Sequence, residues 1–269
     1  MFDFHSDKST YFNYQYKTAK EYIIPFLEDC FELKSDFKVL EIGCAEAGVL
    51  KAFTELGHEC VGIELSAGRV NLAQQFLAEE VKANQIRFII KNIYDIDVEA
   101  DIGHKFDLVI LKDVIEHIHN QELFIGKLKD FLTPQGKVFF GFPPWQMPFG
   151  GHQQVSTVKF LSFLPYYHLL PMKLYKKFLR FFGENEQKIN GLVEIKETGI
   201  SIERFERIFK KEGYTQLRRQ FFLFNPIYKY KFNLKPRVQF KLLSAIPVFR
   251  NFVSTCAYYL IEIRDEQST

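Results

Sequence analysis

Two carboxylates and a loop of small residues are the first features of this sequence that could do chemistry. An apolar run that contains Glu41 leads into the loop 43–48, which reads Gly-Cys-Ala-Glu-Ala-Gly, and a second apolar run ends at Glu64. Small residues let a backbone approach a ligand closely, and the free N–H groups of a following helix can donate to it. A carboxylate at the end of the next strand can accept both hydroxyls of a ribose. These residues therefore predict a site for a nucleotide-like cofactor.

The elements that must position these residues alternate between two types. Apolar runs that predict strands lie at 38–43, 59–64, 86–91, 107–112 and 136–142. Helical patterns lie between most of them, and Ser66 is a suitable N-cap for a helix over 67–80. Residues 18–33 have helical spacing within a leading segment, 1–35. The alternation predicts an α/β fold with a doubly wound, mostly parallel sheet.

The rhythm changes after Pro143. Residues 144–200 are rich in Pro, Gly and aromatic residues and show no strand alternation, so we expect an inserted, mobile lid within a domain that spans 36–269. An amphipathic helix is predicted over 201–212, with Ile202, Phe205, Ile208 and Phe209 on one face. Two β-like runs, 217–232 and 252–263, predict an antiparallel pair at one edge of the sheet.

Charge is unevenly distributed along the 269 residues. Residues 171–250 carry 18 Lys or Arg against 7 Asp or Glu, although the whole chain has a net charge of only +2. A solvated helical face, an anionic substrate and a membrane surface all remain open as explanations. We expect no spanning helix, because no uncharged apolar run is long enough. The N-terminus has no signal-peptide pattern and the four cysteines have no C-x-x-C spacing, so we expect reduced thiols and a cytoplasmic location.

The segment 106–118, which reads FDLVILKDVIEHI, is the most specific string in the chain, and 132–138 follows with LTPQGKV. Together with the loop at 43–48, these strings resemble the class I S-adenosylmethionine-dependent methyltransferases, in particular the quinone-biosynthesis branch. The resemblance covers residues 37–143 well and the late strand pair more loosely. It implies a seven-stranded sheet with the last strands antiparallel. Ala45 and Ala47 stand where the family has glycines.

The resemblance implies S-adenosylmethionine as cofactor and S-adenosylhomocysteine as product. The loop would hold the methionine and ribose end, Glu64 the ribose hydroxyls, and Asn92 the adenine amino group, with Asp95 as a second candidate for that role. Asn92 stands where the family usually has Asp, and an amide oxygen can still accept. The predicted cofactor-binding residues are Glu41, Gly43, Cys44, Ala45, Gly48, Glu64, Leu65, Asn92, Ile93, Lys112 and Asp113.

Methyl transfer from a sulfonium needs an in-line nucleophile in a dry pocket, and an oxygen nucleophile often needs a base. His152 and His117 are the two candidate bases, although each could instead make structural hydrogen bonds. No metal is expected, because no clustered ligand spacing is visible. We expect a small, partly apolar substrate. A lipid-like substrate and peripheral membrane contact through 163–182 remain open.

Two other classes of protein compete with this interpretation. An NAD-type oxidoreductase would share the first two strand ends, but its glycine fingerprint is absent. A non-catalytic relative that binds cofactor or a partner protein also remains, because two loop glycines are replaced. Nucleic-acid substrates are not expected, because residues 111–114 lack the Asn/Asp-Pro-Pro-aromatic motif of amino-group methyltransferases. The oligomeric state is open.

Overall fold

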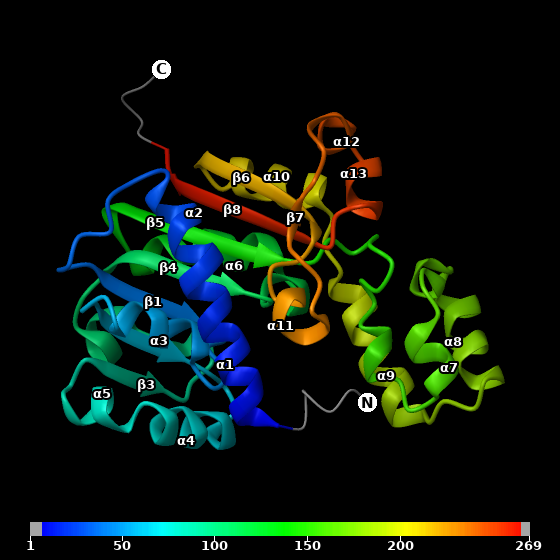
Figure 1. Ribbon diagram of the computed structural model, residues 1–269, viewed down its shortest axis with the longest axis horizontal. Helices are drawn as coiled ribbons and strands as arrows, with labels where there is room; N and C mark the ends of the chain where they lie inside the picture. Colours follow the sequence, from blue (N-terminus) through cyan, green and yellow to red (C-terminus); the bar gives the residue numbers. More distant parts are fainter. Residues whose placement is uncertain (1–6, 265–269) are drawn as a thin grey trace.

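A single mixed sheet organises the chain in the computed structural model, which describes residues 7–264 (Figure 1). Its strand order is β3-β2-β1-β4-β5-β8-β6-β7. The first five strands in this order are parallel, and β8, β6 and β7 are antiparallel to their neighbours. The strands are β1 (Lys38–Ile42), β2 (Glu59–Ile63), β3 (Ile86–Ile89), β4 (Phe106–Lys112), β5 (Leu132–Phe142), β6 (Tyr214–Phe224), β7 (Arg237–Val238) and β8 (Cys256–Ile263).

Both faces of the sheet are buried, which explains why its parallel strands are continuous apolar runs. In β4, Leu108 and Ile110 pack on one face, while Val109 and Leu111 pack on the other. The first face is covered by α2 (Ile24–Glu28), α3 (Gly48–Thr54) and α4 (Ala67–Phe76), and the second by α6 (Gln121–Phe131) and α10 (Ile202–Lys211). This arrangement confirms the doubly wound α/β fold.

The predicted helices form with small changes at their ends. Ser66 caps α4 by accepting from the Arg69 N–H, and the helical run then breaks at Leu77 before α5 (Ala78–Lys82). Ser201 caps α10, whose four predicted apolar residues are all buried. The leading segment is helical from Lys8, through α1 (Lys8–Thr18), a π-helical turn (Ala19–Ile23) and α2, so the helix predicted over 18–33 starts earlier and ends sooner.

The insertion 144–200 forms a helical subdomain with its own small core. It contains α7 (Lys159–Phe163), α8 (Met172–Phe181) and α9 (Glu186–Thr198), and Leu161, Tyr175, Leu179, Ile189 and Leu192 are buried among them. Its two ends meet, because the Trp145 N–H donates to the Ile200 carbonyl at 2.9 Å. The insertion also contains two short turns of 3-10 helix, Gln153–Val155 and Tyr167–Leu169. Two more such turns, Ile93–Asp95 and Ile115–His117, lie in the loops after β3 and β4. A π-helical turn, Val98–Ile102, precedes β4.

The predicted late strand pair is confirmed, since β6 and β8 are antiparallel neighbours. The β-like run predicted over 217–232 was too long. Strand β6 ends at Phe224, because Asn225 and Pro226 turn the chain into α11 (Tyr228–Phe232). The connection back to β8 adds the short edge strand β7, which is the eighth strand, and the helices α12 (Lys241–Ala245) and α13 (Phe249–Phe252).

Candidate functional site

The loop after β1 forms a tight cradle at the carboxyl ends of the parallel strands. Gly43 and Cys44 donate their N–H groups to the Ile63 carbonyl at 2.8 and 3.2 Å, which ties the loop to β2. Gly43 has a positive φ of 70°, and a side chain there would meet Val114. Ala45 and Ala47 also have positive φ values, 50° and 63°. The alanines therefore occupy a backbone geometry that favours glycine, at a cost of about 1–2 kcal/mol each.

Glu64 lies directly beyond β2, where its carboxylate reaches back to the loop. It accepts the Ala45 N–H at 3.0 Å and the Ser66 N–H at 2.9 Å. Arg69 approaches the same carboxylate at 4.0 Å. Two backbone donors thus orient Glu64 toward the open side of the cradle, where the carboxylate keeps unused lone pairs.

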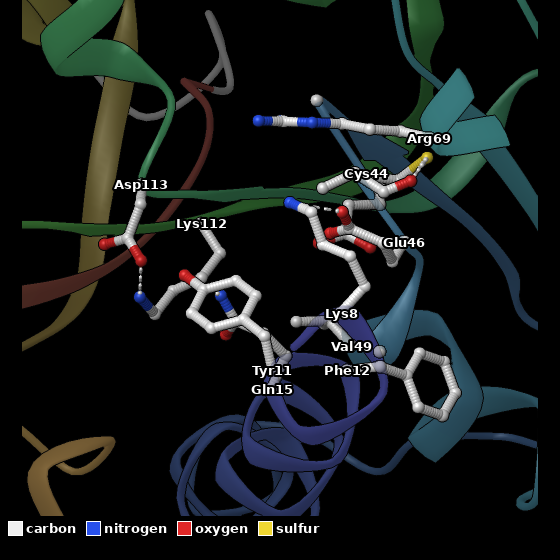
Figure 2. Close-up of a pocket in the computed structure, with 14 residues that line it drawn as sticks. Lys8, Tyr11, Phe12, Gln15, Cys44, Glu46, Val49, Arg69, Lys112 and Asp113 are labelled. Carbon is white, nitrogen blue, oxygen red and sulfur yellow. Dashed lines mark hydrogen bonds and ion pairs between the residues drawn. The ribbon is translucent and has the colours of Figure 1, made fainter. Parts of the chain in front are cut away.

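A cavity of about 180 Å³ lies against the loop, and we call it the charged cavity. Figure 2 shows that it is closed from one side by Lys8, Tyr11, Phe12 and Gln15 of α1 and from another by Lys112 and Asp113 at the end of β4. Its lining includes three acidic and three basic side chains: Glu41, Glu46, Asp113, Lys8, Arg69 and Lys112. Helix α1 can approach the loop this closely because Gly48 has no side chain. A Cβ atom at that position would collide with the Phe12 carbonyl.

The electrostatics of the charged cavity depend on two buried groups. Burial raises the pKa of Glu41 well above its ordinary value, and Lys112 opposes this only in part. One oxygen of Glu41, Oε2, has no hydrogen-bond partner within residues 7–264. Burial is the largest influence on the pKa of Lys112 and would lower it, but the ion pair with Asp113, together with Cys256 and Tyr11, holds the pKa above the ordinary value. Asp113 itself has a positive φ of 57°.

A second cavity of about 460 Å³, the apolar cavity, meets the charged cavity at Gly43. Glu64 stands at its edge, and most of the other lining is apolar or aromatic, including Ile63, Leu65, Ile93, Tyr94, Val114, Leu123 and Phe124. Asn92 also lines it, with a side chain that accepts the Tyr94 N–H at 3.1 Å and so caps the following turn. The two cavities together offer one charged and one mainly apolar compartment.

A third cavity of about 690 Å³, the lid cavity, lies between His117 and helix α9. His117 lines both the apolar cavity and the lid cavity. His117 is itself exposed, yet the protein around its ring lowers its pKa by desolvation, and Asp113 opposes that effect. The imidazole is therefore neutral at neutral pH and can accept a proton. The ring of His152 packs edge-on against it, with 5.0 Å between ring centroids. His152 is half-buried, has a positive φ of 54° and does not line these three cavities.

Glu116 adds a carboxylate to this histidine pair. Ligand atoms of Glu116, His117 and His152 lie within 4.8 Å of one another. Glu116 is buried, its pKa is raised well above the ordinary value by burial and by Asp113, and neither carboxylate oxygen has a hydrogen-bond partner within residues 7–264. Two imidazoles and a carboxylate at this spacing could hold a divalent cation as well as move a proton. Sequence spacing did not predict this group, because His152 is far from the other two in the chain.

The structure brings most of the predicted cofactor residues together around the first two cavities. Glu41, Gly43, Cys44, Ala45, Gly48, Lys112 and Asp113 line the charged cavity, and Gly43, Glu64, Leu65, Asn92 and Ile93 line the apolar cavity. Asp95 does not line either of them. No sequence pattern indicated Lys8, Tyr11 or Gln15 as lining residues, since α1 has no marked apolar face. Tyr94 and Leu123 were also missed, because they lie on turns and helix starts after the strands.

Comparisons with known proteins identify relatives of this chain. A family described as methyltransferase domain matches residues 14–157, which is more than half of the chain. A ubiquinone biosynthesis O-methyltransferase of Bartonella tribocorum is 26% identical over 167 residues, covering 62% of this chain and 64% of that protein. One from Rhodopseudomonas palustris is 30% identical over 102 residues, 38% of each chain. The chain therefore spans less than two thirds of the length of these relatives.

Two solved structures share the fold. An S-adenosylmethionine-dependent methyltransferase from Clostridium acetobutylicum has a TM-score of 0.56 at 11% identity, covering 93% of this chain and 92% of that one. A magnesium protoporphyrin IX methyltransferase from Synechocystis has a TM-score of 0.53 at 16% identity, covering 94% and 84%. At these identities the likeness concerns the fold alone.

Proposed function

The chain belongs to the methyltransferase domain family, and from this premise we propose that it is a class I S-adenosylmethionine-dependent methyltransferase. It binds S-adenosylmethionine, transfers the methyl group to a small molecule and releases S-adenosylhomocysteine. The observation that carries the proposal is the pair of cavities that meet at Gly43, one lined by charges of both signs and the other mainly apolar. The cofactor has the same two halves, a zwitterionic amino acid and a nucleoside.

The charged cavity suits the methionine end of the cofactor. An ammonium group needs anionic or carbonyl acceptors, and a carboxylate needs cationic or N–H donors. Glu41, with its unpaired buried oxygen, is the natural acceptor for the ammonium. Lys112 at the floor and Arg69 at the rim are candidate partners for the carboxylate. Helix α1 covers this end from one side (Figure 2).

The apolar cavity suits the adenosine end. Glu64 stands at the junction, where the ribose would lie, and the carboxylate can accept both ribose hydroxyls while it retains its loop contacts. Adenine is flat and mostly apolar, so Leu65, Ile93 and Leu123 can pack against its faces. Asn92 can accept from the amino group, although its oxygen also caps the turn at Tyr94.

We propose an oxygen nucleophile on a small, partly apolar substrate. Two curated relatives are named ubiquinone biosynthesis O-methyltransferases, and this supports a phenol-like acceptor. The substrate oxygen attacks the methyl carbon, the carbon–sulfur bond breaks with its electron pair going to sulfur, and the hydroxyl proton passes to a base. His117 and His152 are the candidate bases, since His117 faces two cavities and is neutral at neutral pH. The triad with Glu116 also fits a cation that would lower the pKa of the hydroxyl.

In this proposal the insertion 144–200 acts as a lid that covers the substrate. A lipid-like molecule is one candidate for that substrate. Helix α8 turns Tyr175 and Leu179 into the lid core, so most of its apolar face is occupied. Leu174 and Phe181 remain exposed beside lysines, and Phe181 is 81% exposed. This supports at most a limited contact of residues 163–182 with a membrane surface. Within the described residues, no helix is long and apolar enough to cross a bilayer.

Calorimetric titration separates the proposal from its two competitors. We expect S-adenosylhomocysteine to bind with a Kd below about 1 mM and NAD to give no saturable heat. Binding of NAD alone would favour an oxidoreductase, and binding of neither ligand would favour an interaction module. A non-catalytic relative would bind S-adenosylmethionine but would transfer no labelled methyl group to any of a panel of phenolic acceptors.

A further inference from the structure

The connection between β6 and β8 exposes an unusual number of large apolar side chains. We call residues 234–249 the C-terminal arm; it includes β7, α12 and the start of α13. Leu242 is 77% exposed and Phe240 is 62% exposed. Val238, Ile246, Val248 and Phe249 are exposed as well. A cluster of this kind on a folded protein indicates a surface that is covered by something else.

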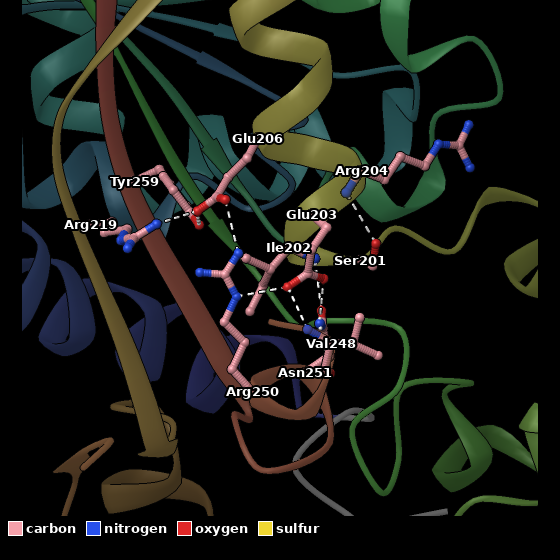
Figure 3. Close-up of polar contacts among 10 residues, drawn as sticks. All are labelled: Ser201, Ile202, Glu203, Arg204, Glu206, Arg219, Val248, Arg250, Asn251 and Tyr259. Atoms are coloured by element: carbon pink, nitrogen blue, oxygen red, sulfur yellow. Dashed lines mark hydrogen bonds and ion pairs between the residues drawn. The ribbon is translucent and has the colours of Figure 1, made fainter. Parts of the chain in front are cut away.

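The arm is firmly attached at its root, so its exposed residues are not simply part of a loose loop (Figure 3). The buried Arg250 donates to Glu203 and to Glu206 of α10, each at 2.8 Å. Asn251 donates to Glu203 at 2.6 Å and accepts the Ile202 N–H at 2.8 Å. At the other end of the arm, the Gln239 N–H donates to the Phe221 carbonyl at 2.8 Å.

Val248 lies near the end of the arm, two residues before Arg250, and has a φ of 66° and a ψ of −53°. A β-branched residue is a genuine outlier at positive φ, and glycine would be the unstrained choice. Its N–H is held by the Glu203 carboxylate at 2.9 Å. The sequence therefore keeps an exposed valine where glycine would fold better, which indicates that the apolar side chain is needed for a contact.

The chain segment that contains the arm carries charged side chains of one sign only. Between Glu212 and Glu262 the chain has eight Lys or Arg and no Asp or Glu. Arg219 forms an ion pair with Glu206, and Arg250 forms one with Glu203. Lys235, Arg237 and Lys241 of the arm, by contrast, form no ion pair with any residue from 7 to 264. The exposed apolar side chains are therefore mixed with free cations.

The arm lies at the same end of the sheet as the candidate site. Phe142 at the carboxyl end of β5 pairs with Ala257, and Cys256 pairs with Phe222, so the arm leaves and re-enters the sheet where the parallel strands end. Figure 1 shows α12 and α13 at this end, which the lid helices α7–α9 also occupy. A surface that docks on the arm would thus approach the entrance to the cavities.

We propose that the C-terminal arm is a peripheral docking surface for a bilayer that contains anionic lipids. Apolar side chains interleaved with free lysines and arginines suit the boundary between headgroups and acyl chains. A second copy of the chain fits less well, because a twofold contact would place the same cations opposite one another. This inference goes beyond methyl transfer and is tested without cofactor or substrate.

Vesicle flotation with the full chain tests it. We expect the wild-type protein to float with vesicles of phosphatidylcholine plus 30% phosphatidylglycerol and to remain at the bottom with phosphatidylcholine alone. The reverse-charge double variant Lys235→Glu/Lys241→Glu should lose this preference, and high salt should weaken it. Leu242→Glu should lower the partition by about tenfold or more.

Two further variants keep the outcome decisive. Val248→Gly should lower the partition while thermal stability stays the same or rises, so reduced binding there cannot be ascribed to misfolding. Phe181→Glu on α8 is the matched control and should change the partition much less than Leu242→Glu. Equal binding to both kinds of vesicle, or undiminished binding of Leu242→Glu, would overturn the proposal. So would a concentration-dependent dimer in sedimentation that Leu242→Glu dissociates, because the surface would then be covered by a second copy.

Discussion

At the scale of single residues, the histidine pair and the loop alanines matter most. His117 and His152 are distant in the chain, yet their rings pack edge-on beside the buried Glu116. The sequence indicated both histidines as candidates but not their contact, because only the fold of the loop after β5 brings them together. Ala45 and Ala47 could be identified in the sequence as replacements of expected glycines. Their positive φ values show that both positions have a backbone conformation that favours glycine.

The first residue-scale prediction concerns the base. His117→Ala or His152→Ala should lower turnover of a phenolic acceptor by about 10²–10⁴-fold and leave the affinity for S-adenosylhomocysteine nearly intact. Since desolvation lowers the pKa of His117, wild-type kcat/KM should rise with pH through a pKa below 6.5, as the imidazole loses its proton. His104→Ala, at a half-buried histidine that pairs with Glu59 and does not line the three cavities, is the control. A loss of less than tenfold in both variants would remove the histidines from the mechanism.

The second residue-scale prediction concerns the strained loop. Ala45 has a φ of 50° and is only half-buried. Ala45→Gly should therefore relieve left-handed strain and raise the free energy of unfolding by about 0.5–1 kcal/mol, net of the greater unfolded-state entropy of glycine. Ala78→Gly, in the first turn of α5, should instead be destabilising. Chemical denaturation measures both, and a loss of stability in Ala45→Gly would contradict the strain argument.

At the scale of elements, the strands were predictable and the covers over the site were not. Buried parallel strands are continuous apolar runs, so their positions follow from the sequence to within a few residues. Helix α1 has no marked apolar face, and its packing depends on the backbone contact at Gly48. Its position over the charged cavity therefore could not be predicted from a sequence pattern. The insertion 144–200 was indicated in the sequence only by its loss of strand alternation. Its three-helix core depends on contacts within the insertion.

The element-scale prediction concerns the pH stability of the lid. The buried His168 accepts from Gln153 at 2.7 Å and donates to the Trp145 carbonyl at 2.8 Å in the neutral tautomer that satisfies both. Burial lowers its pKa to about 4, whereas an unfolded histidine titrates near 6.5. The unfolded lid therefore binds more protons between these values, and its stability falls as pH drops below 6.5.

At pH 5 this loss should reach about 2 kcal/mol relative to pH 8. The protection factors of the amides in 145–170, which correct for the slower intrinsic exchange at low pH, should fall accordingly. His168→Asn should flatten the dependence, and His104→Gln, at a half-buried histidine paired with Glu59, should not. An equal fall in the protection factors of wild type and His168→Asn would mean that another group controls the lid.

At the scale of the whole molecule, the site, the lid and the C-terminal arm gather at one end of the sheet (Figure 1). The excess of positive charge over 171–250 was visible in the sequence, but its division between internal ion pairs and free cations was not. Arg250 is buried against α10, while Lys235 and Lys241 stay exposed. Only the fold separates structural charges from those available to a partner.

We place the ribose of the cofactor at Glu64, and the affinity of the Glu64→Ala variant for S-adenosylhomocysteine is the decisive measurement of this position. Removal of a charge-assisted contact to both ribose hydroxyls should cost about 1.5–3 kcal/mol, or roughly 10- to 150-fold in Kd by calorimetry. Glu59→Ala, at the opposite end of β2, is the matched control and should bind as the wild type does. An unchanged Kd in Glu64→Ala, or equal losses in both variants, would contradict the proposed site.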